Sequence, residues 1–377
     1  MTPKIESFLA RHGSETPCLV VDLEAVAENY RRLGRALPLA RIHYAVKANP
    51  APQILTTLAG LGSCFDAASV SEIDDCLAAS APPENISFGN TIKKQTDIAH
   101  AFRRGVRLFA FDSDEELWKL AAAAPGSRVY CRILTASEGA DWPLSRKFGC
   151  QLDMAGDLMV RAGDLGLEPY GISFHVGSQQ TDSEQWRIAI GRTAMVFSDL
   201  AEAGIKLGMI NLGGGFPVRY RRDIPAFEHY AEAIMQAMIR HFGNDPPEMI
   251  VEPGRCIAAE AGIIETEVVL VSRKSYDRKE PRWIYLDVGR FGGLAETMNE
   301  SIEYPIRTPH NGGEKGPVVL AGPTCDGADI LYEKAAYSLP LDLKAGDRLR
   351  LLAAGAYTTT YASAGFNGFG LLREYYI

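Results

Sequence analysis

Short apolar runs with strand character recur along the first two thirds of the chain. Ile42, Tyr44 and Val46 occupy every second position of the segment 41–46, and this period of two is typical of a β-strand. Asn49-Pro50 ends the run, because proline has no N–H for the ladder and restricts the residue before it. Eight runs of this kind are predicted as strands: Arg41–Val46, Cys64–Ala67, Ile86–Gly89, Leu108–Phe111, Val129–Ile133, Gly171–Phe174, Met209–Leu212 and Met249–Glu252.

Helical patterns lie between these strands. They are predicted over Glu24–Leu37, Val70–Ala79, Ile98–Arg104, Glu115–Ala124, Met154–Leu165, Ser183–Ala203 and Ala226–His241. Regular alternation of strand and helix predicts an α/β fold, and eight strands favour a closed (β/α)₈ barrel of the TIM type. An open, doubly wound sheet alternates in the same way and is the second choice.

The pattern changes after Arg255, where β-like runs follow one another with few helical stretches. These runs are Ile263–Val271, Trp283–Asp287, Pro317–Ala321, Arg348–Leu352 and Tyr357–Ala362. A further strand near Cys18 precedes the barrel, and we expect it to pair with this β half. The predicted domains are therefore a barrel over 26–256 and a discontinuous, mostly-β domain formed by 1–25 and 257–377.

Composition narrows the possible partners. The chain has 377 residues, of which 46% are hydrophobic and 23% charged, and its formal charge is 39 − 47 = −8. This sign disfavours nucleic acid and anionic membranes as partners, and it is compatible with a small cationic substrate. Seven scattered cysteines with no CxxC pair and no zinc-type spacing predict reduced thiols, no metal site and a cytoplasmic protein. We expect neither a signal peptide nor a membrane span of ~18 apolar residues.

Lys47 is a candidate catalytic residue because it lies at the carboxyl end of the first barrel strand, where α/β folds gather their catalytic groups. A lysine held there away from water would favour its neutral amine, the form that Schiff-base chemistry requires. An isolated lysine at a strand end is more often exposed to solvent.

Other strand ends supply complementary groups: Asp66 on the second, Arg132 on the fifth, His175 to Ser178 after the sixth, Gly213-Gly214-Gly215 after the seventh, and Glu252 with Gly254-Arg255 after the eighth. Glycines let backbone N–H groups close on an anion, and barrels often bind phosphate near strands seven and eight. His175 alone could be a core histidine, and Glu252 could simply pair with Arg255. Together, lysine, histidine, glutamate and a phosphate cradle predict a pyridoxal phosphate site.

Five motifs strengthen that prediction: Ala45-Val46-Lys47-Ala48-Asn49, Ser173-Phe174-His175-Val176-Gly177-Ser178, Gly213-Gly214-Gly215-Phe216-Pro217, Glu252-Pro253-Gly254-Arg255 and Gly322-Pro323-Thr324-Cys325-Asp326. Together they resemble the fold-type-III pyridoxal phosphate decarboxylases, the group of ornithine, lysine and diaminopimelate decarboxylases. The likeness is closest to ornithine decarboxylase and runs from about Pro17 to the C-terminus.

The resemblance implies an alanine racemase-like architecture, a barrel plus a C-terminal β-domain, and a homodimer with active sites at the subunit interface. It implies that Lys47 holds the cofactor covalently, that His175 stacks on its ring and that Glu252 pairs with the pyridine nitrogen. The residues implied to bind the phosphate are Ser178, Gly213, Gly214, Gly215, Gly254, Arg255 and Tyr357, while Asp66 and Arg132 line the cofactor pocket.

The same resemblance assigns the substrate end of the site. Cys325 matches the residue that reaches across from the partner subunit and reprotonates the α-carbon, and Asp326 matches the carboxylate that receives the distal ammonium. A free cysteine is most often a small core residue, but its position after Gly322-Pro323 is loop-like. Glu300 lies near a position that is usually aspartate in ornithine decarboxylases, so it is a further substrate-binding candidate.

Ornithine is the predicted substrate, giving putrescine and CO₂ in polyamine biosynthesis. Diaminopimelate decarboxylases typically have glutamate after the cysteine and an Arg-Pro segment before it, whereas here Asp326 follows Cys325 and 294–300 contains no arginine. Lysine, or both substrates, is the nearest alternative, because one methylene is worth only ~1–3 kcal/mol. A non-catalytic regulatory homologue is disfavoured because Lys47 and Cys325 are retained. An alanine-racemase-like isomerase, which shares the barrel and the lysine, is disfavoured by Glu252.

Overall fold

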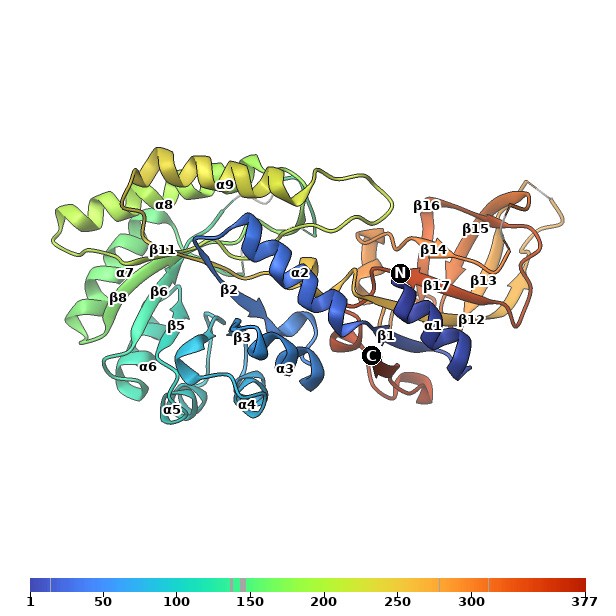
Figure 1. Ribbon diagram of the computed structural model, residues 1–377, viewed down its shortest axis with the longest axis horizontal. Coiled ribbons are helices and arrows are strands. Elements are labelled where there is room, and N and C mark those ends of the chain that lie inside the picture. Colours follow the sequence, from blue (N-terminus) through green and yellow to red (C-terminus); the bar gives the residue numbers. More distant parts are fainter. Residues whose placement is uncertain (14, 136–137, 143–146, 278, 311) are drawn as a thin grey trace. The chain divides into compact units, whose positions relative to one another are not determined.

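The computed structural model describes residues 1–13, 15–135, 138–142, 147–277, 279–310 and 312–377 (Figure 1). The chain forms two compact units, the barrel unit of Ala27–Pro217 with Ile224–Gly254, and the β unit of Met1–Val26, Val218–Asp223 and Arg255–Ile377. The segment 218–223 was expected in the barrel. It belongs to the β unit because Arg221 forms an ion pair with Glu303 at 2.9 Å and donates to the Ala336 carbonyl at 3.0 Å.

The barrel unit is built on eight parallel strands that close in the order β10-β11-β2-β3-β4-β5-β6-β8. Closure confirms the (β/α)₈ prediction and excludes the open sheet. The strands are β2 Ala40–Ala45, β3 Cys64–Ala67, β4 Ile86–Phe88, β5 Leu108–Phe111, β6 Arg128–Arg132, β8 Glu168–Ser173, β10 Met209–Asn211 and β11 Glu248–Val251. A short antiparallel pair, β7 Ala140–Trp142 and β9 Ser178–Gln180, accompanies them.

Helices surround this ring of strands (Figure 1). They are α2 Leu23–Ala36, α3 Pro52–Gly60, α4 Val70–Ala78, α5 Gln95–Arg103, α6 Asp114–Ala123, α7 Leu152–Asp164, α8 Glu184–Glu202 and α9 Phe227–Phe242. Ser69 and Ser113 cap α4 and α6 by accepting the backbone N–H three residues ahead, which satisfies donors that a helix start leaves free. Helix α3 was not predicted, since its sequence contains no charged residue that would mark a solvent-facing side.

Large side chains fill the barrel, so its interior is a packed core. Ala110, Tyr130, Met209 and Ile250 form one buried layer. Gly171 on β8 leaves room for the neighbouring strand, because a Cβ there would lie 2.3 Å from the Met209 carbonyl oxygen of β10. The barrel therefore requires the absence of a side chain at this position.

The β unit contains an eight-stranded sheet with the path β14-β17-β12-β13-β15-β16. Strand β1 pairs with β12 and β18, as expected for the strand near Cys18. The elements are α1 Pro3–His12, β1 Cys18–Val21, α10 Arg255–Ala258, β12 Gly262–Ser272, β13 Arg282–Leu286, β14 Ile306–Arg307, β15 Lys315–Ala321, β16 Ile330–Pro340, β17 Arg348–Leu352 and β18 Arg373–Tyr376.

The predicted strand Tyr357–Ala362 is wrong. Tyr357 has φ +56°, and Thr359–Tyr361 is a 3₁₀ turn. Thr358 donates its hydroxyl to the Ala354 carbonyl at 3.0 Å, so a local side-chain bond holds the turn. Conversely, the eleven-residue strand β16 was missed, because its apolar and charged residues do not alternate regularly.

No helix within the described part of the chain is long and apolar enough to cross a bilayer. Among the same residues, His, Cys, Asp and Glu side chains form no group of three or more that could hold a metal ion.

We expect Gly171→Ala to lower the free energy of unfolding by about 2 kcal/mol, because the new methyl group pushes β8 away from a backbone carbonyl that cannot swing aside. Urea denaturation measures the change. Gly156→Ala is the matched control: a Cβ at this position in α7 meets nothing within 4 Å, so it should stabilise the helix by about 0.5–1 kcal/mol. Equal effects of the two variants would contradict the packing argument.

Candidate active site at the carboxyl end of the barrel

Lys47 lies in a 3₁₀ turn, Val46–Ala48, that follows β2 directly. Buried Val46 and Ala48 anchor the turn on either side. The Lys47 Nζ is 3.2 Å from the Asp66 Oδ2 on β3, and its side chain is 47% exposed in the single chain. The expected exclusion of water is therefore not present in the single chain.

Asp66 is almost fully buried, and its second oxygen is unusual. Oδ1 has no hydrogen-bond partner among the described residues. It faces Gly89 so closely that a Cβ there would lie 1.8 Å from it. A buried carboxylate oxygen without a donor is unfavourable. In the single chain this oxygen is thus packed against the residue that follows β4 and is closed to solvent.

Glu252 follows β11 and is oriented by a residue that the sequence analysis missed. Asn211, at the end of β10, donates its amide Nδ2 to Glu252 Oε1 at 2.5 Å. Its own Oδ1 accepts the N–H of Gly213 at 2.9 Å. One amide thus fixes both the carboxylate and the start of the glycine run. An asparagine at the end of a buried strand, directly before Leu212 and the glycines, was the available signal.

Electrostatics make Glu252 a poised acid. Desolvation raises the pKa of Glu252 to about 7, with a further contribution from the Asp66 charge, while Lys47, the Asn211 hydrogen bond and Arg132 oppose the rise. A second carboxylate at the same rim disfavours the ionised form of Glu252. A cation bound between them would be stabilised, and it would lower the pKa of Glu252 in return.

His175 follows β8 and is held as a neutral ring. Its Nδ1 accepts the N–H of Gly177 at 3.0 Å, which leaves the proton on Nε2. Desolvation, followed by the charges of Arg132 and Lys47, lowers the pKa of His175 well below 6.5. Desolvation lowers the pKa of Arg132, at the end of β6. The Arg132 guanidinium lies 5.5 Å from the centre of the Phe148 ring. A flat, uncharged imidazole suits stacking on an aromatic ligand.

The glycine run passes through a space that excludes side chains. A Cβ at Gly213, Gly214 or Gly215 would lie 2.2, 2.5 or 2.3 Å from the carbonyl oxygens of Phe174, Glu252 and Gly177, respectively. The carbonyls of Gly213 and Gly215 accept from Glu252 and Gln180. The N–H groups of Gly214 and Gly215 donate to no described residue. Free N–H groups in a glycine turn at the end of a strand are a typical anion-binding arrangement.

Two other predicted phosphate residues flank this run in the barrel unit. Ser178 begins β9, where it pairs with Trp142 of β7 through the backbone. Gly254 ends the barrel unit, one residue after Pro253, whose carbonyl accepts the N–H of Ala45 at 3.0 Å. That bond fastens the end of β11 to the strand that leads to Lys47. The barrel unit therefore brings Lys47, Asp66, Arg132, His175, Glu252 and the glycine run to one end.

The β unit holds the remaining cofactor candidates, Arg255 and Tyr357. Arg255 opens α10, and its guanidinium forms two bonds with the Glu296 carboxylate, at 2.5 and 2.7 Å. Its centre lies 4.9 Å from the Tyr357 ring centroid. The left-handed backbone of Tyr357 therefore points its ring at the arginine. Sequence analysis did not predict Glu296.

Cys325 and Asp326 are exposed on a loop of the β unit. Asn367 Oδ1 accepts the Cys325 N–H at 3.0 Å and lies 3.3 Å from its Sγ. Buried Asp329 fixes the base of the loop by accepting the Thr324 hydroxyl at 2.7 Å. The thiol is therefore held in place while it stays open to solvent.

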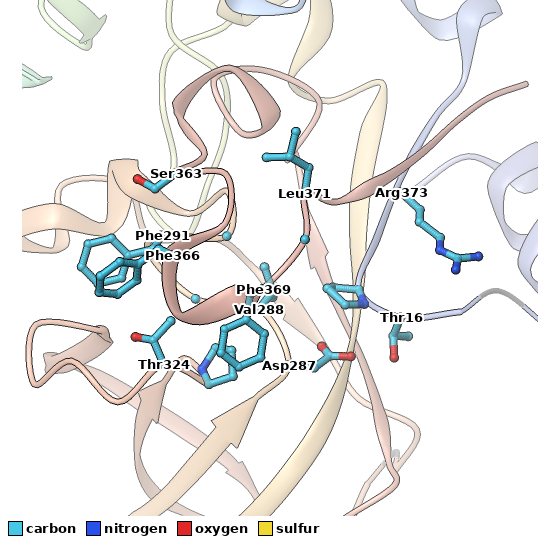
Figure 2. A pocket seen from close by; sticks show the side chains of 15 residues that line it. Thr16, Asp287, Val288, Phe291, Thr324, Ser363, Phe366, Phe369, Leu371 and Arg373 are labelled. Atoms are coloured by element: carbon cyan, nitrogen blue, oxygen red, sulfur yellow. The ribbon is translucent and has the colours of Figure 1, made fainter.

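A pocket of about 130 Å³ adjoins this loop. Figure 2 shows Phe291 and Phe366 side by side along one wall, with Thr324 close to them. The two ring centroids are 4.7 Å apart. The pocket places an aromatic wall next to the residue that precedes Cys325.

Glu300 is held by the protein's own backbone. Its carboxylate accepts the N–H groups of Glu333 and Lys334 at 2.8 Å each, and that of Ala335. Partial burial opposes ionisation, but these three donors lower the pKa of Glu300 overall. In the single chain the carboxylate is thus bound to β16, and its role on the substrate stays a prediction. The register of the Asn299-Glu300 turn, with φ +55° and +57°, could not be predicted.

A family model described as the pyridoxal-dependent decarboxylase, pyridoxal binding domain, matches residues 23–259. The chain belongs to the pyridoxal-dependent decarboxylases. A lysine/ornithine decarboxylase of Selenomonas ruminantium is 36% identical over 94% of this chain and 88% of its own length. An ornithine decarboxylase of Schizosaccharomyces pombe is 33% identical over 95% and 82%. The predicted resemblance is thereby confirmed.

Solved structures agree with this membership. The Selenomonas enzyme in complex with PLP and cadaverine matches with a TM-score of 0.88 and 34% identity, over 99% of this chain and 93% of that one. A Paramecium bursaria Chlorella virus arginine decarboxylase bound to agmatine matches with a TM-score of 0.91 and 29% identity over all of both chains. This protein is a pyridoxal phosphate-dependent amino-acid decarboxylase with an alanine racemase-like fold.

The barrel rim of this decarboxylase fits its cofactor. The raised pKa of Glu252 and the free N–H groups of Gly214 and Gly215 are the features that a cationic ring bearing a phosphate would satisfy. The neutral His175 ring provides a flat surface beside them.

We expect Glu252→Gln to change how the stability of the apoprotein depends on pH. Because the folded-state pKa of Glu252 is about 7, above the unfolded value of 4.5, the folded protein binds this proton more tightly, and stability falls as pH rises between these values. The free energy of unfolding of wild type, relative to that of Glu252→Gln, should fall by at most about 3 kcal/mol across that window. Screening of the charge by solvent makes the change smaller. Urea denaturation from pH 4 to 8 measures it.

Substitution of an exposed glutamate, Glu84→Gln, is the control, since it should leave the pH dependence as in wild type. A Glu252→Gln curve parallel to that of wild type would contradict the desolvated carboxylate.

Proposed function

We propose that this decarboxylase acts on L-ornithine, releasing CO₂ and putrescine as a step of polyamine synthesis. The observation behind the choice is the exposed pair Cys325-Asp326, in which an acid follows directly on the thiol. Asp326 uses Oδ1 to accept the Ala328 N–H at 2.8 Å, so the loop itself fixes this carboxylate. A fixed acid complements the distal ammonium of a basic amino acid.

The relatives support a basic substrate and leave its length open. They include ornithine, lysine/ornithine and arginine decarboxylases, and two of the solved structures hold cadaverine or agmatine. Asp326 has the shorter acidic side chain, and Glu300 is engaged with β16. Lysine, or both substrates, is the second choice, because a single methylene changes binding by only ~1–3 kcal/mol.

Each rim residue receives a role in this proposal. Lys47 holds the cofactor through its amine, His175 covers one face of the ring, and Glu252, oriented by Asn211, keeps the pyridine nitrogen protonated. The cofactor then supplies an electron sink for the bond to the carboxylate. Asp66 and Arg132 line the pocket, and the groups proposed to bind the phosphate are Ser178, Gly213, Gly214, Gly215, Gly254, Arg255 and Tyr357.

Cys325 supplies the last proton. We assign its Sγ–H to the Cα of the product, from the partner subunit of a homodimer with shared sites. The exposure of the thiol supports this role, because a residue that serves another subunit must be open in its own. The hydrogen-bond acceptor Asn367 Oδ1, 3.3 Å away, orients the thiol.

Release of CO₂ from ornithine, lysine, arginine and meso-diaminopimelate, measured in parallel on the purified holoenzyme, tests the substrate. We expect kcat/KM to be highest for ornithine, with lysine about tenfold or more lower. Faster turnover of lysine or arginine would shift the assignment to that substrate. Preference for diaminopimelate would contradict the role of Asp326, and no turnover of any substrate would indicate a non-catalytic homologue.

Mixing two variants that each fail to form the normal product tests the shared site. Lys47→Ala should lose the cofactor absorbance band, and Cys325→Ala should keep it but release an aberrant product, because Cα would be protonated elsewhere. In a mixture, one of the two sites of a heterodimer has both residues intact, so up to about a quarter of wild-type activity should return for random pairing. Cys256→Ala, a partly buried cysteine outside the predicted set, is the control. An unrestored mixture would contradict sharing between subunits.

A further inference from the structure

Arg255 belongs to a buried cluster of charge within the β unit. Its Nη2 is 2.5 Å from Glu296 Oε1, and its Nη1 is 2.7 Å from Glu296 Oε2. Both side chains are only 3% exposed. Tyr220 accepts a further bond from Nη1 at 2.9 Å through its hydroxyl. An arginine with two carboxylate bonds and one phenol bond has a single side-chain position.

The local fold leaves Glu296 no alternative orientation. It lies in the 3₁₀ segment Ala295–Glu300, between buried Leu294 and buried Thr297. The Thr297 hydroxyl donates to the Leu294 carbonyl at 2.6 Å, and the Glu296 carbonyl accepts the Ile302 N–H at 3.1 Å. These bonds fix the backbone on both sides of the acid. The carboxylate is therefore rigid before anything binds.

Glu296 controls two properties of Arg255. Burial disfavours a charged guanidinium, and the Glu296 charge more than offsets it, so the pKa of Arg255 lies well above its ordinary value. The contacts with Glu296 and Tyr220 engage both terminal nitrogens of the guanidinium. The guanidinium therefore keeps a fixed direction. A cation fixed in advance loses little freedom when it meets an anion.

We infer that Glu296 is a positioning residue for the cofactor phosphate, acting through Arg255. The inference rests on the proposed role of Arg255 in binding that phosphate. Arg255 is the last residue of the Glu-Pro-Gly-Arg motif. Its ion pair with Glu296 therefore links this motif to a segment 41 positions later in the chain. Tyr220 has the same function from the segment 218–223.

Comparison of pyridoxal phosphate with pyridoxal, which lacks the phosphate, isolates this effect. The full-length apoprotein of each variant is titrated with each compound, and the two values of Kd are obtained from the absorbance change. In Glu296→Gln the Kd for pyridoxal phosphate should rise about tenfold, the scale of one hydrogen bond to a charged group. The Kd for pyridoxal should stay within about twofold. The ratio of the two is the readout, and activity is not needed.

A double variant then tests whether Glu296 acts through Arg255. Arg255→Gln should lower the preference for the phosphate at least as much as Glu296→Gln, and the combination should lower it no further than Arg255→Gln alone. Additive losses would show that Glu296 acts by another route and would overturn the inference.

Glu265→Gln is the matched structural control. Glu265 is 2% exposed in the same unit and pairs with Arg348 and Arg350 at 3.3 and 3.2 Å. It should lower the melting temperature, as Glu296→Gln should, but leave the ratio of Kd values unchanged. If Glu296→Gln does not fold, Glu296→Asp keeps the charge on a shorter arm and should lose less than tenfold.

An unchanged or increased preference for the phosphate in these Glu296 variants would overturn the positioning role. If the protein did not bind this cofactor at all, wild type would bind neither compound. That result is distinct from an unchanged ratio of the two Kd values.

Discussion

The chemistry of this protein depends on two carboxylates held out of water at the end of a closed barrel. Asp66 and Glu252 end strands β3 and β11, and strand β2 lies between them in the ring. Closure brings the two carboxylates together with the basic side chains of Lys47 and Arg132, next to the neutral ring of His175. Desolvation disfavours the charged forms of these side chains when no ligand is bound between them. The raised pKa of Glu252 and the unpaired Asp66 oxygen are two expressions of that constraint.

Much of this arrangement could be predicted from sequence because it follows from periodicity. Alternating residues identified the strands, and parallel closure required their carboxyl ends to meet. Lys47, Asp66, His175, Glu252 and the glycine run were therefore predicted to lie at one end of the barrel before any geometry was known. Which atom meets which depends on side-chain rotamers. For that reason the half-exposed Lys47 and its 3.2 Å contact with Asp66 were not predicted.

The residues that sequence analysis missed or misplaced share one physical property. Asn211 and Glu296 each bond to a group 41 positions away in the chain. Glu300 bonds to a group 33 positions away. No local period reports such pairing. Tyr357 was misplaced for a related reason, since its β-branched neighbours favour a strand while its φ of +56° and the Thr358 bond impose a turn. The available signal was a polar residue next to a buried segment. This signal does not identify the group to which the residue bonds.

The choice of asparagine at position 211 explains how Glu252 stays available for its role. A lysine or arginine there would hold the carboxylate firmly, but it would also neutralise it and exclude a second cation. An amide donates one hydrogen bond, fixes the orientation and adds no charge. Arg132 and Lys47 act on Glu252 through their charges. The negative charge that Glu252 gains above its pKa is thus held in position by a neutral donor, as its proposed pairing with a cationic ring nitrogen requires. By contrast, Glu296 is matched with a full cation, which suits a carboxylate that has to fix its partner.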